Sequence, residues 1–128
     1  MIAVDTNVLI YAHRQDDEWR SPALTTVRQL AEGTATWSIP WPCLHEFVAI
    51  STHPRIFDPP STRDQAIEQV NAWLASPSVV LLAEGIDHWQ QLVEMLNQGQ
   101  VRGPKVHDAR IAAICIEHGV SEFPDIRP

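Results

Sequence analysis

Three carboxylates in this 128-residue chain stand at positions where apolar side chains surround them in the sequence: Asp5, Glu46 and Asp108. Asp5 directly follows the apolar run of residues 1–4 and is soon followed by a second apolar run, residues 8–10. A strand that is apolar on both faces normally lies inside a covered sheet, and an ionised carboxylate is expensive to bury without a partner. Something in the folded protein must therefore compensate these charges.

Glu46 and Asp108 are predicted to share the inward faces of helices. Apolar residues follow Asp108 after three, four and seven positions: Ile111, Ala112 and Cys115. Residues at this spacing lie on one helix face. Ala49 and Ile50 follow Glu46 after three and four positions. Both acids are therefore expected to point inward from their helices.

Inward carboxylates on separate elements are typical of a site for a hard divalent cation. Mg²⁺ and Mn²⁺ take oxygen ligands and are commonly held by a few carboxylates together with waters and substrate phosphate. Two such ions about 3.5–4 Å apart can activate a water and stabilise an in-line displacement at phosphorus. This chemistry requires no cysteine or imidazole ligand.

Each acid also has an ordinary structural interpretation, which stays open at this point. Asp5 is suited to be a helix N-cap that accepts from the backbone of Asn7 or Val8. Asp108 falls in the first turn of its helix, where the helix dipole favours an acid. Glu46 is able to pair with a neighbouring arginine.

The chain alternates between strand-like and helix-like segments, which predicts an α/β domain with a central, largely parallel sheet. Strands are expected at residues 2–4, 34–40 and 79–82. Helices are expected from residue 8 and at residues 22–32, 42–53, 64–76, 87–97 and 106–118. Asp5 then lies at the carboxyl end of the first strand, the sheet edge where open α/β sheets bind ligands.

Caps and apolar faces give further expectations for the helices. Ser21 and Thr62 are predicted N-caps. The apolar face of the helix after Thr62 is predicted to hold Ile67, Val70 and Leu74, and that of the helix after residue 87 to hold Trp89, Leu92, Val93 and Leu96. The five tryptophans favour core and dimer packing over base stacking.

The size and composition bound the class of protein. A mass of 14.4 kDa fits one domain, residues 1–128, with a single core. We expect a soluble, cytoplasmic protein without a membrane segment, because no apolar stretch approaches the roughly 20 residues that span a bilayer. The two cysteines, Cys43 and Cys115, lie in apolar helical patterns and are interpreted as small buried hydrophobes.

The net charge of −7, from 16 acidic and 9 basic residues, argues against non-specific adhesion to nucleic acid. It does not exclude an enzyme that acts on nucleic acid. Carboxylates that hold divalent cations present positive charge where a phosphate arrives.

Three segments together resemble a known family. MIAVDTNVLIYAHR resembles the opening of PIN-domain ribonucleases, and WPCLHEFVAISTHPRIF and VRGPKVHDARIAAICIEHGV resemble the second and third motifs of the VapC toxins of bacterial toxin–antitoxin pairs. The similarity runs in register from residue 1 to about residue 122. It implies a three-layer α/β/α PIN-like domain and a metal-dependent endoribonuclease that acts as a toxin.

The resemblance also implies a cofactor, partners and site residues. Mg²⁺ or Mn²⁺ would be the cofactor, RNA the substrate, a small antitoxin protein the inhibitor, and a homodimer the usual state. The acids of the three motifs correspond to Asp5, Glu46 and Asp108, as catalytic residues and metal ligands. Thr6 and Asn7 share the turn of Asp5 and would orient Asp5 or a bound water.

Basic residues near the motifs are candidates for contacts with substrate phosphates or with the acids of an antitoxin. Arg14 lies in the first motif segment and Arg110 in the third, with Arg102 and Lys105 beside them. Ordinary surface charge is the alternative for each.

The chain departs from the family after about residue 122. Family members usually continue with a strand beside the first strand and a T-x-D-x-D-F turn that supplies a fourth acid, whereas this chain continues at once with FPDIRP. A sheet strand is therefore expected to be missing or replaced, and a second metal position to be weakened. Asp125 is a candidate substitute for the fourth acid.

Three functions remain in competition. The leading hypothesis is a toxin that hydrolyses RNA phosphodiester bonds with Mg²⁺ or Mn²⁺. The second is a catalytically inactive PIN-like protein that only dimerises and binds an antitoxin, motivated by the absent terminal motif. The third is a phosphatase or receiver-like domain, which is disfavoured because Asp5 is followed by T-N-V-L rather than by a D-x-D-x-T nucleophile pattern.

Overall fold

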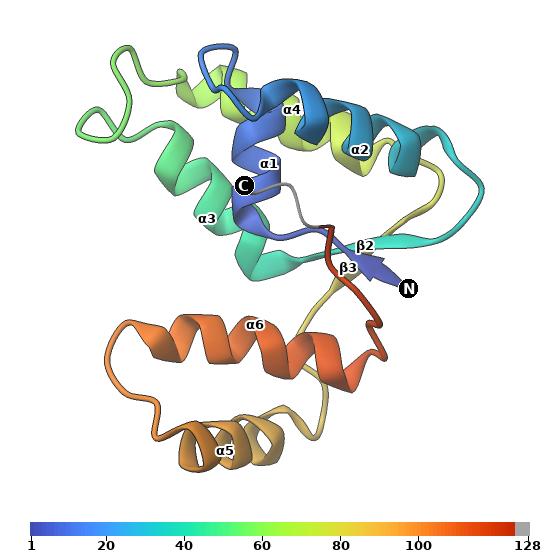
Figure 1. The fold of residues 1–128 in the computed structure, drawn as a ribbon, viewed down its shortest axis with the longest axis vertical. Coiled ribbons are helices and arrows are strands. Elements are labelled where there is room, and N and C mark those ends of the chain that lie inside the picture. Colours follow the sequence, from blue (N-terminus) through green and yellow to red (C-terminus); the bar gives the residue numbers. More distant parts are fainter. Residues whose placement is uncertain (125–128) are drawn as a thin grey trace.

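The computed structural model of the chain describes residues 1–124, whose helices surround a small sheet (Figure 1). In chain order the elements are β1 (Ile2–Ala3), α1 (Thr6–His13), α2 (Arg20–Glu32), β2 (Trp37–Pro40), α3 (Trp41–Ser51), α4 (Arg63–Leu74), β3 (Val79–Leu82), α5 (His88–Gly99) and α6 (Lys105–Glu117). This alternation confirms the predicted α/β class.

The sheet is parallel, with the strand order β1-β2-β3. Trp37 of the central strand pairs with Ile2 on one side and with Val79 on the other. All residues of β2 are buried, as expected for the middle strand of a covered parallel sheet. β2 begins at Trp37 instead of residue 34, because the neighbouring strands provide ladder partners only from Trp37 onward.

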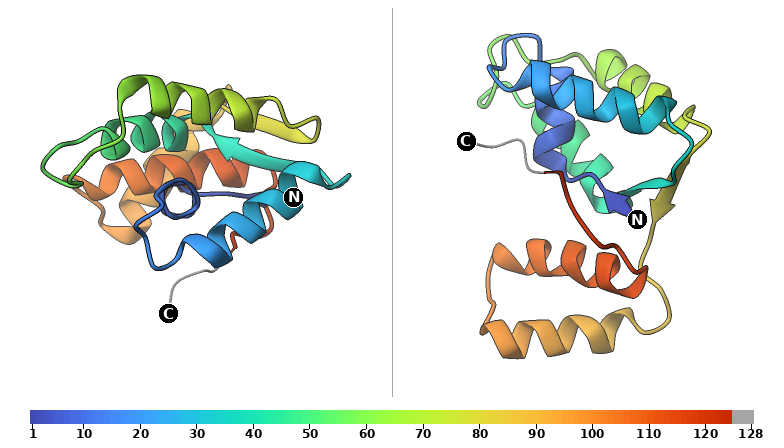
Figure 2. Two further views of the ribbon diagram at one scale, coloured as in Figure 1. Left: turned by 90° about the horizontal axis from the view of Figure 1, so that it is seen from above. Right: turned by 45° about the vertical axis from the view of Figure 1, so that its right-hand side comes forward.

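Helices cover both sides of the sheet, as the predicted three-layer arrangement requires. Figure 1 shows α1–α4 gathered above the strands and the α5–α6 hairpin below them, and the turned view on the right of Figure 2 shows the same division. The main core lies in the upper part and includes Val4, Leu9, Trp37, Ile39, Leu44 and Phe47.

The α5–α6 hairpin has a small apolar cluster of its own. Leu92 of α5 packs with Ala109 and Ala113 of α6, and partly buried apolar side chains surround them. The prediction that Trp89 belongs to the apolar face of α5 was wrong, because its side chain is 68% exposed. The side of α5 that packs on this cluster carries Leu92, Met95 and Leu96, and Trp89 lies outside it.

The start of α2 differs from the prediction. The helix begins at Arg20 and its N-cap is Trp19, so Ser21 lies inside the first turn and is no cap. The preceding turn explains the earlier start, because the Trp19 backbone N–H donates to the Asp17 carboxylate at 2.8 Å.

The N-terminus of α4 confirms the predicted cap, but its buried face differs from the prediction. Thr62 and Gln65 form a reciprocal capping box. Ile67 and Leu74 are exposed, whereas Ala66 and Trp73 are buried. Trp73 packs edge-on against Phe47 of α3, with ring centroids 4.8 Å apart. Val70 packs against the main core as predicted, so the buried face of α4 is formed by Ala66, Val70 and Trp73, and Ile67 and Leu74 lie outside it.

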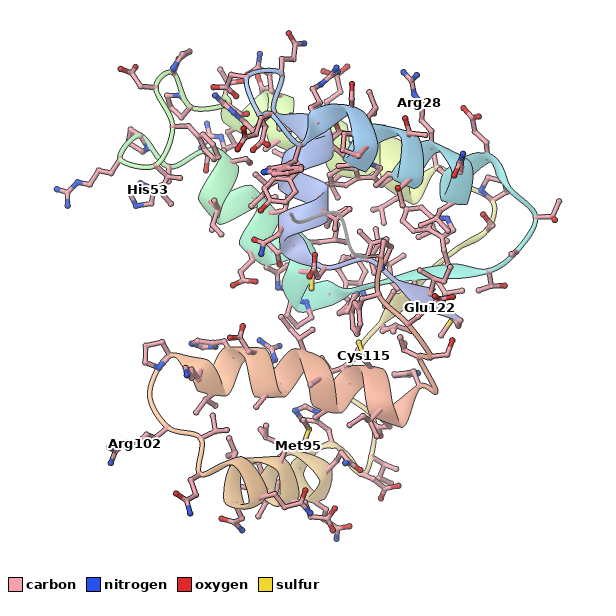
Figure 3. The ribbon with its side chains drawn as sticks, viewed as in Figure 1. Arg28, His53, Met95, Arg102, Cys115 and Glu122 are labelled. Atoms are coloured by element: carbon pink, nitrogen blue, oxygen red, sulfur yellow. The ribbon has the colours of Figure 1, made fainter. Side chains whose placement is uncertain are left out.

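The end of the described chain lies beside β1 (Figure 3). Ile2 and Glu122 form an isolated parallel bridge, in which the Ala3 N–H donates to the Glu122 carbonyl oxygen at 3.1 Å. A single bridge therefore stands where the family usually places a strand. Asp125 lies outside the described residues.

Within residues 1–124, none of the helices combines the length and the apolar character needed to cross a bilayer. Both cysteines are buried and unpaired.

Truncation of Trp73 tests the observed packing of α4. Trp73→Ala should lower the free energy of unfolding by about 3–5 kcal/mol, since it removes a buried aromatic side chain from the core. Ile67→Ala, on the exposed side of the same helix, should change it by less than about 0.5 kcal/mol. Urea denaturation measures both variants. Equal losses would contradict the observed orientation of α4.

Candidate active site

One pocket of about 310 Å³ brings together the three predicted acids, Asp5, Glu46 and Asp108. It lies at the carboxyl end of β1, where α6 runs beneath the ends of α1 and α3 (Figure 1). Each acid comes from a different helix or helix start, so the fold joins residues that are far apart in the sequence. The other lining residues are Thr6, Asn7, Ile50, Ile111, Ala112 and Phe123.

Asp5 is held at the start of α1 by a backbone hydrogen bond. It is the N-cap of this helix, and its Oδ1 accepts from the Val8 N–H at 3.2 Å. The structural interpretation of Asp5 as a cap is therefore correct, and the positive end of the helix dipole offsets part of its charge. The cap also fixes the direction of the carboxylate toward the pocket that it lines.

Glu46 is positioned by Thr6. The buried Thr6 hydroxyl donates to Glu46 Oε2 at 2.7 Å and so joins the start of α1 to the middle of α3. We expected Thr6 to orient Asp5 or a water, and the structure corrects this: the partner is the second acid. A hydroxyl that donates to this oxygen restricts the rotation of the Glu46 carboxylate.

The Cys43 thiol next to these groups is unreactive. Burial raises its pKa to about 12, and the nearby charges of Asp5 and Glu46 act in the same direction. A thiol with this pKa stays protonated at neutral pH, so Cys43 supplies no thiolate ligand.

Asp108 reaches the pocket from the opposite wall. It lies in the first turn of α6 and lines the pocket together with Ile111 and Ala112, as the helical spacing predicted, but it is exposed at the pocket rim and not buried. The buried alanines of α6, Ala109 and Ala113, pack in the cluster with Leu92 of α5. The hairpin thus determines where Asp108 stands relative to the other two acids.

The pocket combines three acids with no basic side chain among its described lining residues. Their mutual repulsion makes this arrangement suited to a divalent cation, and oxygen ligands are those that Mg²⁺ and Mn²⁺ prefer. Across residues 1–124, no three Asp, Glu, His or Cys side chains are grouped closely enough to bind one ion together. The residues still fit Mg²⁺, which is usually bound through one or two carboxylates and keeps several waters.

The remaining candidate residues have different places. Asn7 is exposed and lines the pocket, as its position beside Asp5 suggested. Arg14 does not line it. The buried guanidinium of Arg14 forms a bidentate pair with Asp16, at 3.0 and 2.8 Å, and lies 4.2 Å from the Phe57 ring centroid. These contacts give Arg14 a structural role at the end of α1.

Arg110 lines a neighbouring pocket that also includes Glu46. Its Nε donates to the Glu84 carboxylate, and this contact holds the pKa of Glu84 below its usual range. The sequence reasoning did not identify Phe123 as a lining residue of the acidic pocket. No sequence pattern places Phe123 there. Its position follows from the bridge that the preceding residue, Glu122, forms with Ile2 of β1.

Comparison with known proteins identifies the family. The profile of the PIN domain matches residues 2–123. The chain belongs to the PIN domain family. The PIN chain is 36% identical to Ribonuclease VapC37 of Mycobacterium tuberculosis over 121 residues, which cover 94% of this chain and 84% of the relative. It is 30% identical to Ribonuclease VapC43 of the same species, with 94% and 82% covered.

Solved PIN structures agree with the fold. The crystal structure of Mycobacterium tuberculosis VapC20, described as a sarcin–ricin loop cleaving toxin, aligns with a TM-score of 0.70 at 18% identity and covers 96% of this chain and 87% of that one. VapBC2 from Rickettsia felis, bound to a DNA fragment from its promoter, aligns with a TM-score of 0.63 at 18% identity, with 95% and 86% covered. The expected PIN architecture is thereby confirmed.

Proposed function

We propose that this PIN-domain protein is a toxin that hydrolyses phosphodiester bonds in RNA with the help of Mg²⁺ or Mn²⁺. The observation that carries the proposal is the convergence of Asp5, Glu46 and Asp108 on one pocket whose lining, within residues 1–124, includes no basic side chain. Relatives that are at least 30% identical and are named VapC ribonucleases support the choice of RNA.

The residues of the pocket would divide the work of binding and proton transfer. Asp5 and Glu46, each held by one hydrogen bond, would hold the cation, and Asp108 would face it across the pocket from α6. When bound, a divalent cation lowers the pKa of a water and offsets the charge of the phosphate oxygens.

Hydrolysis then requires that phosphorus exchanges one oxygen substituent for another. The oxygen of a water bonds to phosphorus while the bond from phosphorus to the departing ribose oxygen breaks. A pocket carboxylate accepts the proton of the attacking water, and solvent supplies the proton of the departing oxygen. Among the described lining residues there is no basic side chain that would pair with the carboxylates, so they stay available to accept this proton.

A protein antitoxin and a second copy of the chain are the proposed partners. The Rickettsia felis structure contains a VapB–VapC pair, which supports an antitoxin as inhibitor. An antitoxin would have to cover the pocket or hold α6 away from α3. We also propose a cytoplasmic location, where RNA and the antitoxin are present.

A specific observation keeps a second function open, namely a protein without catalysis that only dimerises and binds an antitoxin. Where a fourth acid is usual in the family, the described chain contributes a single bridge at Glu122 and the apolar side chain of Phe123. The experiment that tests hydrolysis separates the two functions.

Removal of a pocket acid should abolish cleavage. Asp5→Asn keeps the helix cap, since asparagine also caps, but loses the charge. We expect it and Asp108→Asn to lower the rate of RNA cleavage by at least about 100-fold, more than is typical for residues that only support a ligand. Cleavage of a mixed RNA pool with Mg²⁺ or Mn²⁺ measures this, and EDTA should stop it.

Asp64→Asn is the matched control, because Asp64, like Asp108, is an exposed acid in the first turn of a helix but lies on α4, outside the acidic pocket. It should leave cleavage unchanged. Folded wild-type protein that cleaves no RNA, or cleavage that persists in EDTA and in Asp5→Asn, would contradict the proposed enzyme. The first result would favour the binding-only function.

Thr6 should act through Glu46. Thr6→Val removes the hydroxyl that donates to Glu46 Oε2 and should lower cleavage by about 10–100-fold, with a higher Mn²⁺ concentration needed for half-maximal rate. Thr6→Ser keeps a hydroxyl and should restore most of the rate. Equal activity of the valine and serine variants would show that this hydrogen bond has no part in the reaction.

The proposed homodimer has a simple test. Light scattering of the purified chain should give twice the mass of 14.4 kDa. A mass of 14.4 kDa at all concentrations would contradict the dimer and leave the hydrolytic proposal untouched.

A further inference from the structure

A second pocket lies beside the acidic pocket and has the opposite chemistry. It measures about 300 Å³, lies between α3 and α6, and shares Glu46 and Ile111 with the acidic pocket. Its other lining residues are Pro42, His45, Ala49, His107 and Arg110. We call this cavity the side pocket.

The side pocket combines apolar walls with hydrogen-bond donors. Pro42, Ala49 and Ile111 provide the apolar surface, while two imidazoles and one guanidinium provide polar groups. The Trp41 ring lies against His45, with centroids 6.1 Å apart and planes tilted by 32°. Trp41 is 38% exposed, so this pair offers an accessible aromatic surface next to the cavity.

Arg110 already has one partner before any ligand arrives, in a partly exposed ion pair with Glu84. Its Nε donates to the Glu84 carboxylate, so its side chain is restrained on α6. Within the described chain its terminal nitrogens have no hydrogen-bond partner. A restrained guanidinium loses little side-chain entropy when it binds a ligand edge with two parallel hydrogen bonds.

We propose that the side pocket binds one nucleobase of single-stranded RNA, with a preference for guanine. Unpaired bases are recognised by apolar or aromatic stacking together with hydrogen bonds to their edges. Guanine presents two neighbouring acceptors, O6 and N7, and arginine is the side chain that matches them best. Of the described pocket linings, that of the side pocket unites such donors with apolar walls directly beside the acids.

The shared residue Glu46 gives the base a place relative to the reaction. A strand whose phosphate occupies the acidic pocket needs to extend only past Glu46 to place a neighbouring base in the side pocket. This link to the cut rests on the proposed function, whereas base binding does not. The side pocket would thus select which phosphodiester bond is presented.

The test compares binding of two labelled RNA heptamers, UUUGUUU and UUUUUUU, by fluorescence anisotropy in Mg²⁺. All proteins carry Asp5→Asn to keep the RNA intact. The parent should bind the guanosine-containing RNA at least about 5-fold more tightly, the lower bound for one bidentate contact of this kind. Ala49→Phe, which fills the pocket, and Arg110→Gln should each remove this preference.

Two matched controls separate the pocket from general effects. Ala75→Phe adds the same ring at an exposed position after α4, outside the side pocket, and should keep the preference. Glu84→Gln disrupts the same ion pair as Arg110→Gln but leaves the guanidinium and should also keep it. Absence of a preference in the parent, or its survival in Ala49→Phe, overturns the inference.

Failure of the two proposals would look different. A guanosine preference in a protein whose wild type cleaves no RNA would leave the base site standing and remove the enzyme. Cleavage that depends on Asp5 but shows no guanosine preference would leave the enzyme standing and remove the base site. Cleavage mapping of the otherwise wild-type Ala49→Phe chain should then show the same cut sites as the wild type.

Discussion

The pairing of β1 with β2 is the constraint on which the rest of the site depends. β1 is only Ile2–Ala3, yet the ladder continues beyond it, because the Val4 N–H donates to the Ser38 carbonyl oxygen at 2.9 Å and the Ser38 hydroxyl donates to the Ile2 carbonyl oxygen. Val4 is fully buried, so Asp5 is the first residue to emerge from the sheet. A hydrophobic strand thereby delivers a carboxylate to a fixed point, where α1 begins.

Two hydrogen bonds then fix the acids of the neighbouring helices relative to the end of β1. The cap from Val8 to Asp5 fixes the first acid, and the bond from Thr6 to Glu46 fixes the second relative to it. Glu46 lines both the acidic pocket and the side pocket, so it stands between the carboxylates of the first and the basic side chains of the second. On an acidic protein of net charge −7, the proposed cation, phosphate and base would in this way have separate places.

The sequence predicted the features that depend on local patterns. The capping box at Thr62, the strand Val79–Leu82 and the inward side of α6 at Asp108 follow from residue types and spacing. It failed where one side of a helix is left uncovered: Trp89 and Ile67 have the spacing of core residues, but both are exposed. Nor does any local pattern indicate that Thr6 would meet Glu46, 40 positions away, because the crossing of α1 and α3 decides it.

The α5–α6 hairpin has an apolar cluster of its own, while Ile111 of α6 packs against the main core. At the far end Glu117 joins α6 to the segment before α5, because its carboxylate accepts from the Gly85 backbone N–H at 2.9 Å; a β-carbon at Gly85 would collide with that carboxylate. Local opening of a small unit costs less free energy than global unfolding. We therefore expect the hairpin that carries Asp108 to open more readily than the core around Asp5 and Glu46, and amide exchange in α6 measures this opening.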